Sequence, residues 1–514
     1  MAQSIGTPQK LVSAVFWNFL GKGSLFVLKF FESLLLVRLI GSEQYGLYGS
    51  LINIQSIIAL VISVGLESAL SRFLPQLASE QDYSKLHSLL RRVIRVRAYF
   101  LIPAGILFLL AADFLSTALF HGTLSAFYLR LVVVLIAIVS FHTIFRAFLD
   151  LFFHVRFIAL LDIGMQATYL SIAYILVQNG YGLTGVFCTL IGVNSIGLVL
   201  LFLKYRREKS LLPQATGTSK IARKEIFRYS GTLYVLSLLT YILGKGMDVL
   251  LIGVLLNDLR QVAYYLIAFN IATYALSIID MAVSGNFVVS LIVEARTQGN
   301  IEMQRKIYGG MFELIYVFIV PIAAGGIILH SDIVELLYTP QNIAAASMLV
   351  VFLVSMSVGK LSSIASTFLV LLDKERTIAI SRSIFGIINL ILDLLLIPRY
   401  GAFGAVIATG SIMILVAAYE SFLLYRLITP AYSKSFLVRV ASATFVMAVV
   451  VTLLSNFWKA SNTVTLPGIV VLGGGIYLAC LFWLKPFSEA NIELIRKSNL
   501  PFRGLLLRMI AKGS

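Results

Sequence analysis

The sequence predicts an all-α protein that crosses a membrane many times, and three observations carry this prediction. Of the 514 residues, 59% are hydrophobic and only 13% are charged, whereas soluble domains are about 45–50% apolar. The hydrophobic residues gather in runs of about 18 or more, the length at which a helix spans a bilayer. The chain also matches itself after a shift of about 217 residues. No strand-like alternation competes with these runs, which excludes a transmembrane barrel.

The apolar runs predict fourteen spans. They are expected near residues 12–40, 46–73, 93–119, 129–149, 157–178, 182–204, 229–256, 264–293, 308–329, 345–372, 378–397, 401–427, 438–457 and 466–484. The first two spans should be joined by a tight polar turn at residues 41–46. The longest connection, about 205–228, predicts a linker followed by a basic interfacial helix, and the basic, leucine-rich segment after Pro486 predicts an amphipathic tail.

Lysine and arginine are distributed unequally between the two sides of these spans. The N-terminus, the connections after even-numbered spans and the C-terminal tail hold 32 of the 41 Lys and Arg residues, while the opposite connections hold five. Because such residues collect on the cytoplasmic side, both termini are predicted to be cytoplasmic in a cell membrane. The net charge of +17 then reflects topology and attraction to anionic lipids. We therefore expect no nucleic-acid partner.

The internal match relates spans 1–6 to spans 7–12. Asn53 corresponds to Asn270, and Tyr181-Gly182 corresponds to Tyr400-Gly401. Six spans is an even number, so the two halves insert with the same orientation, which predicts two parallel, pseudo-symmetric six-helix lobes. The expected domains are an N-lobe, a linker with an interfacial helix, a C-lobe, two extra spans, and a tail, at residues 1–204, 205–228, 229–428, 429–485 and 486–514.

Spans 1, 2, 7 and 8 each carry polar residues along one helical face, at about 100° per residue. An ionisable group facing lipid costs about 2.5–3.5 kcal/mol, so these faces should meet each other or line a wet cavity. The alternative is that the charges only neutralise one another inside the bundle. The charged or amide members of these faces include Lys22, Lys29, Glu32, Asn53, Glu67, Lys245, Asp248, Asn270 and Asp280.

Two passages resemble a known family. One runs through Arg38–Tyr48 and Gly65–Arg72, and the other through Asn389–Gly401 and on to Thr409. They resemble the polysaccharide biosynthesis exporters, the Wzx-type O-antigen flippases. That family belongs to the multidrug/oligosaccharidyl-lipid/polysaccharide (MOP) superfamily, together with multidrug and toxin extrusion (MATE) transporters and lipid II flippases. The resemblance covers nearly the whole chain and implies a MATE-like fold with two extra C-terminal helices.

The resemblance implies a flippase that moves a polyprenyl-diphosphate-linked oligosaccharide from the cytoplasmic to the outer leaflet by rocking two lobes. It would serve cell-surface polysaccharide synthesis, such as the O-antigen of lipopolysaccharide. Cationic and amide groups suit the diphosphate and the sugars, which gives the substrate-binding candidates Lys22, Lys29, Asn53, His142, Arg146, Lys245, Asn270 and Lys360. Carboxylates in a partly dry cavity suit ion coupling, which gives Glu32, Glu67, Asp248 and Asp280.

Several of these residues have a plain structural interpretation that stays open. Lys29 with Glu32, and Lys245 with Asp248, are spaced as intrahelical ion pairs. Arg146 is equally suited to anchor a membrane end, and His142 to be a packed polar side chain. Asp393, a turn before Pro398, is expected to be structural.

Two rival functions remain. A drug exporter of the same superfamily predicts a cavity dominated by carboxylates and a twelve-helix chain, and this sequence departs from both. A membrane-embedded glycosyltransferase or polymerase predicts a sizeable catalytic loop, whereas the longest connection here is about 25 residues. We expect no enzyme activity and no cofactor, an ion or proton gradient as the driving force, and a monomer. The expected partners are the lipid-linked oligosaccharide, membrane lipids and other polysaccharide-assembly proteins.

Overall fold

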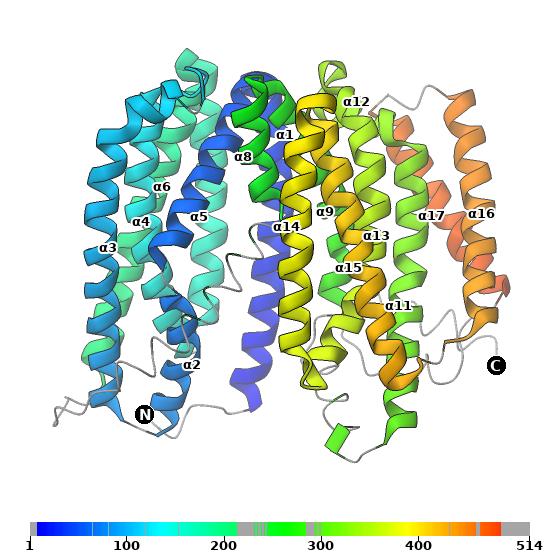
Figure 1. Ribbon diagram of the computed structural model, residues 1–514, viewed down its shortest axis with the longest axis horizontal. Coiled ribbons are helices and arrows are strands. Elements are labelled where there is room, and N and C mark those ends of the chain that lie inside the picture. The colour runs from blue at the N-terminus through cyan, green and yellow to red at the C-terminus, as the bar shows by residue number, and fades with distance from the viewer. Residues whose placement is uncertain are drawn as a thin grey trace. The chain divides into compact units, whose positions relative to one another are not determined.

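The computed structural model describes residues 8–212, 244–283, 300–458 and 463–484, apart from positions 64, 81, 119, 153 and 431. It also describes residues 231, 234, 238, 241, 292, 296 and 297. The predicted interfacial helix within 213–228 and the tail after residue 485 lie outside these residues. Within the described residues the structure contains helices and no strands (Figure 1), which confirms the all-α prediction.

The chain divides by its contacts into two compact units, Met1–Ala263 and Tyr264–Ser514. The first unit contains α1 (Pro8–Ser63), α2 (Leu66–Ser79), α3 (Tyr83–Ala118), α4 (Ala126–Leu151), α5 (Val155–Leu176), the π-helix η2 (Val177–Tyr181), α6 (Gly182–Ser210) and α8 (Lys245–Leu256). Helix α8 therefore groups with the first unit, although we predict its span to begin the second lobe. The boundary between the sequence repeats stays a prediction.

Helix α9 (Leu259–Val283) begins in the first unit and continues into the second. The second unit continues with α11 (Ile301–Ile328), α12 (His330–Tyr338), the 3-10 turn η3 (Pro340–Asn342), α13 (Ala344–Leu371), α14 (Glu375–Tyr400), α15 (Ala402–Ile428), α16 (Lys434–Phe457) and α17 (Thr465–Leu484). Helices α16 and α17 pack beside each other and represent the two predicted extra spans (Figure 1). The short helix α12 was not predicted, because nine residues are too few to span a membrane.

Nine helical stretches of the described residues are long and apolar enough to cross a membrane. One of them, Val155–Ser210, holds two predicted spans in a row. Large apolar side chains are exposed along such helices, for example Phe100, Leu107 and Leu110 on α3. Exposed apolar surface of this extent suits lipid rather than water. The protein is therefore a multi-pass membrane protein, and the count of fourteen spans stays a prediction.

The first predicted span and most of the second lie in α1, and the turn between them is shorter than predicted. Within α1, Gly41 has non-helical backbone angles (φ 78°, ψ 169°), which glycine adopts at little cost, and the helix resumes directly after it. The hydroxyls of Ser33 and Tyr45 lie 3.1 Å apart across this kink. The two halves of α1 therefore pack against each other.

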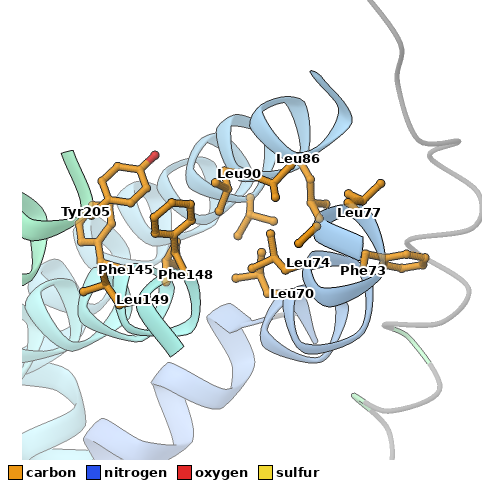
Figure 2. Packing of buried hydrophobic residues seen from close by; sticks show 14 of the residues in the cluster. Leu70, Phe73, Leu74, Leu77, Leu86, Leu90, Phe145, Phe148, Leu149 and Tyr205 are labelled. Carbon is orange, nitrogen blue, oxygen red and sulfur yellow. The ribbon is translucent and has the colours of Figure 1, made fainter. Parts of the chain in front are cut away.

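The predicted span 46–73 is wrong at its end, because the helix breaks at Gly65. This glycine is left-handed (φ 70°) and begins the separate helix α2. On α2, Leu70, Phe73, Leu74 and Leu77 recur at helical spacing and are buried. Figure 2 shows them packed with leucines of α3 and aromatic residues of α4 and α6. Helix α2 carries Glu67, Ser71 and Arg72 among its apolar residues, so it is amphipathic, unlike the more uniformly apolar span before it.

The internal repeat is visible in how equivalent helices pack. Helix α4 packs on α3 and α6 in the first unit, and α13 packs on α11 and α15 in the second. The helix after each repeated motif starts at a glycine of positive φ, Gly182 (47°) or beside Gly401 (64°). A Cβ on Gly185 would lie 2.9 Å from the Leu176 Cβ, and one on Gly404 would lie 2.3 Å from the Leu396 carbonyl oxygen. Both glycines allow the same close approach between successive helices.

Candidate functional site

A carboxylate network centres on Glu32 in the first half of α1. Tyr48, from the second half of α1, donates its hydroxyl proton to Glu32 Oε1 at 2.9 Å. Gln166 of α5 donates its amide to Glu32 Oε2 at 2.8 Å. The Glu32 side chain is 13% exposed and lies 3.9 Å from the Lys29 ammonium, whose own side chain is 59% exposed. Glu32 is thus held by three neighbours, while most of the Lys29 side chain stays exposed.

Two lysines from different predicted spans lie within electrostatic reach of each other. Lys245 begins α8 and is exposed, as is Lys29 on α1, and their positive charges repel. Asp248, one turn along α8, is fully buried. Two ammonium groups held near each other inside a membrane are unfavourable unless an anion or water lies between them.

Lys22 lies on α1, about two turns before Lys29, and its side chain is exposed. Among the described residues no ion pair within 4 Å joins it to a carboxylate, but the Asp150 carboxylate of α4 lies within electrostatic reach of it. Helix α1 approaches α5 closely beside it, because a Cβ on Gly21 would lie 2.7 Å from the Ala159 Cβ. Lys22 therefore sits on the open side of a tight α1–α5 contact.

Arg146 and His142 lie one turn apart on α4. Arg146 makes a two-pronged ion pair with Asp162 of α5, with N–O distances of 2.7 and 2.8 Å, and lies 3.9 Å from Asp150. Such a bidentate pair supports the structural interpretation of Arg146. The Nε2 atom of His142 is buried and has no hydrogen-bond partner among the described residues. The sequence missed Asp162, because nothing on α4 indicates which residue of α5 faces Arg146.

Asn53 lies in the second half of α1 and is buried. Its amide nitrogen donates to the Gly246 carbonyl at 2.6 Å, and its amide oxygen accepts the Tyr241 hydroxyl proton at 2.9 Å. Both ends of the amide are therefore bonded to the seventh predicted span. The equivalent Asn270 lies half-buried on α9.

The remaining candidates are Lys360, Glu67 and Asp280, and the structure describes the side chain of the first alone. Lys360 is half-buried on α13 of the second unit. Glu67 and Asp280 fall on helices α2 and α9, but their side chains are outside the described part of the chain. Their predicted role in coupling stays a prediction.

The second unit holds two buried polar clusters that the sequence did not single out as sites. Glu420 of α15 is almost fully buried and accepts hydrogen bonds from Arg382 of α14, at 2.9 Å, and from Ser366 of α13. Asn389 donates to Asp393 at 3.0 Å and accepts from Thr409 at 3.3 Å. Both clusters join α14 to α15, in keeping with the structural role expected for Asp393.

An apolar cavity of about 430 Å³ lies in the second unit between α9, α11, α12, α16 and α17. Its lining includes Pro321, Gly325, Met447, Val451, Gly474 and Tyr477. The Tyr477 hydroxyl donates to the Val317 carbonyl at 2.5 Å, which ties α17 to α11. Walls of this kind suit a hydrocarbon chain rather than a polar ligand.

Comparison with known proteins decides the family. The family model described as "Polysaccharide biosynthesis protein" matches residues 35–347, more than half of the chain. The chain belongs to this family. The matched residues include Tyr48, the hydrogen-bond partner of Glu32, and also Asn53 and Lys245. No curated protein matches the chain.

Solved structures show that this family member has the fold of the MOP superfamily. The lipid II flippase MurJ, in an inward closed conformation, is 17% identical over 92% of this chain and 98% of its own, with a TM-score of 0.70. An inward-facing MATE multidrug transporter is 16% identical over 79% and 94%, with a TM-score of 0.57. A MOP transporter from Pyrococcus furiosus is 15% identical over 82% and 95%, with a TM-score of 0.51. These likenesses confirm the predicted MATE-like fold.

Proposed function

We propose that this protein is a flippase that carries a polyprenyl-diphosphate-linked oligosaccharide from the cytoplasmic to the outer leaflet of the cell membrane. The observation that carries the proposal is the match of residues 35–347 to the polysaccharide biosynthesis family, and exposed lysines on separate spans, among them Lys29 and Lys245, supply cationic groups for the diphosphate. A diphosphate placed between them would replace repulsion by two charge-assisted contacts. Lys22 is a further cationic ligand of the first unit in this proposal, and Lys360 is a cationic candidate of the second unit.

The apolar cavity of the second unit supports a lipid-linked cargo over a free sugar. The apolar walls offer few hydrogen bonds to a water-soluble glycan, whereas they can make apolar contacts with part of a polyprenyl chain. The family membership supports polysaccharide synthesis as the pathway. A drug exporter for cations fits less well, because the site exposes ammonium groups while Glu32 is held by Tyr48 and Gln166.

The test is transport in proteoliposomes loaded with a polyprenyl-diphosphate oligosaccharide. Alanine at Lys22, Lys29, Lys245 or Lys360 is expected to slow appearance of the glycan in the opposite leaflet by about tenfold or more, because each loses a charge-assisted contact. Arginine at the same positions keeps the charge and is expected to retain part of the rate.

The matched control is Lys306→Ala, which removes an exposed lysine paired with Glu302 on the surface of α11. Its transport should equal that of the wild type. Wild-type transport by all four alanine variants would overturn the anion-binding role of the lysines. Export of cationic dyes without any glycan transport would instead identify a drug exporter.

We further propose that a proton or cation gradient drives transport and that Glu32 is the coupling group of the first unit. Protonation of Glu32 would turn one acceptor oxygen into a donor. The carboxyl group would then lose its bond from either Tyr48 or Gln166, which join the halves of α1 to each other and to α5. A change at one carboxylate would thus loosen one of these two helix contacts.

A further inference from the structure

The seventh predicted span is interrupted at Gly244. The backbone is helical at Tyr241 and again from Lys245, but Gly244 between them is extended (φ −111°, ψ 174°). Short turns bridge the interruption, from the Gly244 N–H to the Tyr241 carbonyl at 3.1 Å and from the Met247 N–H to the Gly244 carbonyl at 3.2 Å. Inside a membrane, the backbone groups at such a break need partners from the protein or from a wet cavity.

Asn53 makes hydrogen bonds to residues on both sides of the break. Its amide nitrogen donates to the carbonyl of Gly246, just after the break, and its amide oxygen accepts from the hydroxyl of Tyr241, just before it. The orientation of the amide is fixed, because a carbonyl requires the NH₂ end of the side chain. One buried side chain of α1 thus braces the break from both ends.

Gly246 allows this arrangement. A Cβ at this position would lie 2.4 Å from two ring carbons of Tyr241. The tyrosine ring therefore lies across the first turn of α8, and only glycine leaves room for it. Lys245 is located between the two braced residues, directly after the break.

We propose that Asn53 is a positioning residue for transport: its two hydrogen bonds hold the break in the seventh span and so fix where Lys245 is presented. Both polar atoms of its amide are engaged within the protein, so its effect on the substrate passes through Lys245. This inference rests on the proposed function, because the lysine pair is the anion site there.

The test measures the position of residue 245 directly. A Lys245→Cys protein, with Cys188 and Cys480 replaced by alanine, is purified and its modification by a water-soluble thiol reagent is timed. Asn53→Ala removes both hydrogen bonds, and Tyr241→Phe removes one while keeping the ring. Because a hydrogen bond contributes about 1 kcal/mol, each lost bond is expected to change the modification rate about fivefold.

Further variants distinguish loss of the Asn53 hydrogen bonds from a general loosening of the protein. Combining Asn53→Ala with Tyr241→Phe should change the rate no more than Asn53→Ala alone, since they share one bond. A cysteine at Lys306, far along the chain on the exposed face of α11, should react at the same rate in every background. In the protein with Lys245 intact, Tyr241→Phe should slow glycan transport as well.

The labelling needs no substrate, so it distinguishes this inference from the proposed function. Shifted labelling with an unexpected transport substrate would keep the brace and reject the glycan. Unchanged labelling in both Asn53→Ala and Tyr241→Phe would overturn the brace. Loss of transport in Asn53→Ala with unchanged labelling would also overturn it, and would make Asn53 a direct ligand of the substrate.

Discussion

Single charged residues inside the predicted spans divide into two kinds. Arg146 and Glu420 are satisfied by partners on neighbouring helices, Asp162 and Arg382. Removing one member of such a pair would leave the charge of the other without its partner. The side chains of Lys22, Lys29 and Lys245 are exposed, and Lys29 also lies 3.9 Å from the Glu32 carboxylate. Because exposure inside a membrane requires water or a ligand, these lysines are the residues that an anionic cargo explains.

At the residue scale, Glu32→Gln tests coupling. The new side chain keeps an oxygen for the Tyr48 hydroxyl but places an NH₂ group where Gln166 donates, and it cannot bind or release a proton. We expect gradient-driven accumulation of the glycan to fall about tenfold or more, while exchange between leaflets without a gradient persists. Transport is measured in proteoliposomes with and without an imposed pH or Na⁺ gradient.

The control for this prediction is Glu302→Gln, a change in a surface pair on α11, which should leave coupling intact. Normal accumulation by Glu32→Gln would remove Glu32 from coupling. Loss of accumulation in Asp393→Asn alone would move coupling to the Asn389–Asp393–Thr409 cluster of the second unit.

The candidate site shows how far sequence reasoning reaches for single residues. Glu32 and Lys29 are predicted from their spacing on one face of the first span, and Asn53 from its place on one face of the second span. The structure describes each of them in contact with a partner. The partners Tyr48, Gln166 and Tyr241 were not predicted as such. Angular position on one helix indicates which side chains share a face, but the facing helix depends on packing across the whole unit.

At the scale of helices, the sequence predicted positions well and interruptions poorly. Each described span has a helix, because long apolar runs have few other solutions in a membrane. The breaks at Gly65 and Gly244 escaped prediction, since a glycine permits a break without requiring one. Helix α2 was merged into a span for the same reason. The repeated glycines before α6 and α15 did mark real boundaries.

A substitution on helix α17 tests whether the apolar cavity binds the lipid part of the cargo. Gly474 lines the apolar cavity and has no atom within 4 Å of an added Cβ. Gly474→Phe is therefore expected to fill the cavity without disturbing the helix contact. It should slow transport of a long polyprenyl substrate about fivefold or more, through loss of apolar contact, and affect a short-chain analogue less. Both substrates are compared in proteoliposomes.

Gly475→Phe is the matched control, because Gly475 is also open to an added side chain but does not line the cavity. It should leave both substrates unaffected. Equal transport of the long-chain substrate by Gly474→Phe and the wild type would show that the cavity does not hold the chain during transport.

At the scale of the whole molecule, symmetry and charge carry the argument. The repeat relates helices of the two units that pack in the same way, and an even number of spans gives both halves one orientation. Only the distribution of lysine and arginine indicates which ends of the spans face the cytoplasm. Orientation matters to the proposed function, because a flippase has to collect its cargo where the glycan is assembled.

Cysteine labelling in intact cells tests that orientation. With Cys188 and Cys480 replaced, single cysteines at Lys10, Gly217 and Lys512 are expected to resist a membrane-impermeant thiol reagent, because the excess of 32 Lys and Arg residues over five places these positions in the cytoplasm. A cysteine at Asp258, in the connection between α8 and α9, is expected outside and should react at once. All four should react after the cells are permeabilised. Labelling of the first three in intact cells, with protection of the fourth, would reverse the orientation. The exposed lysines would then collect their cargo from the outer leaflet, and the direction of transport proposed here would be wrong.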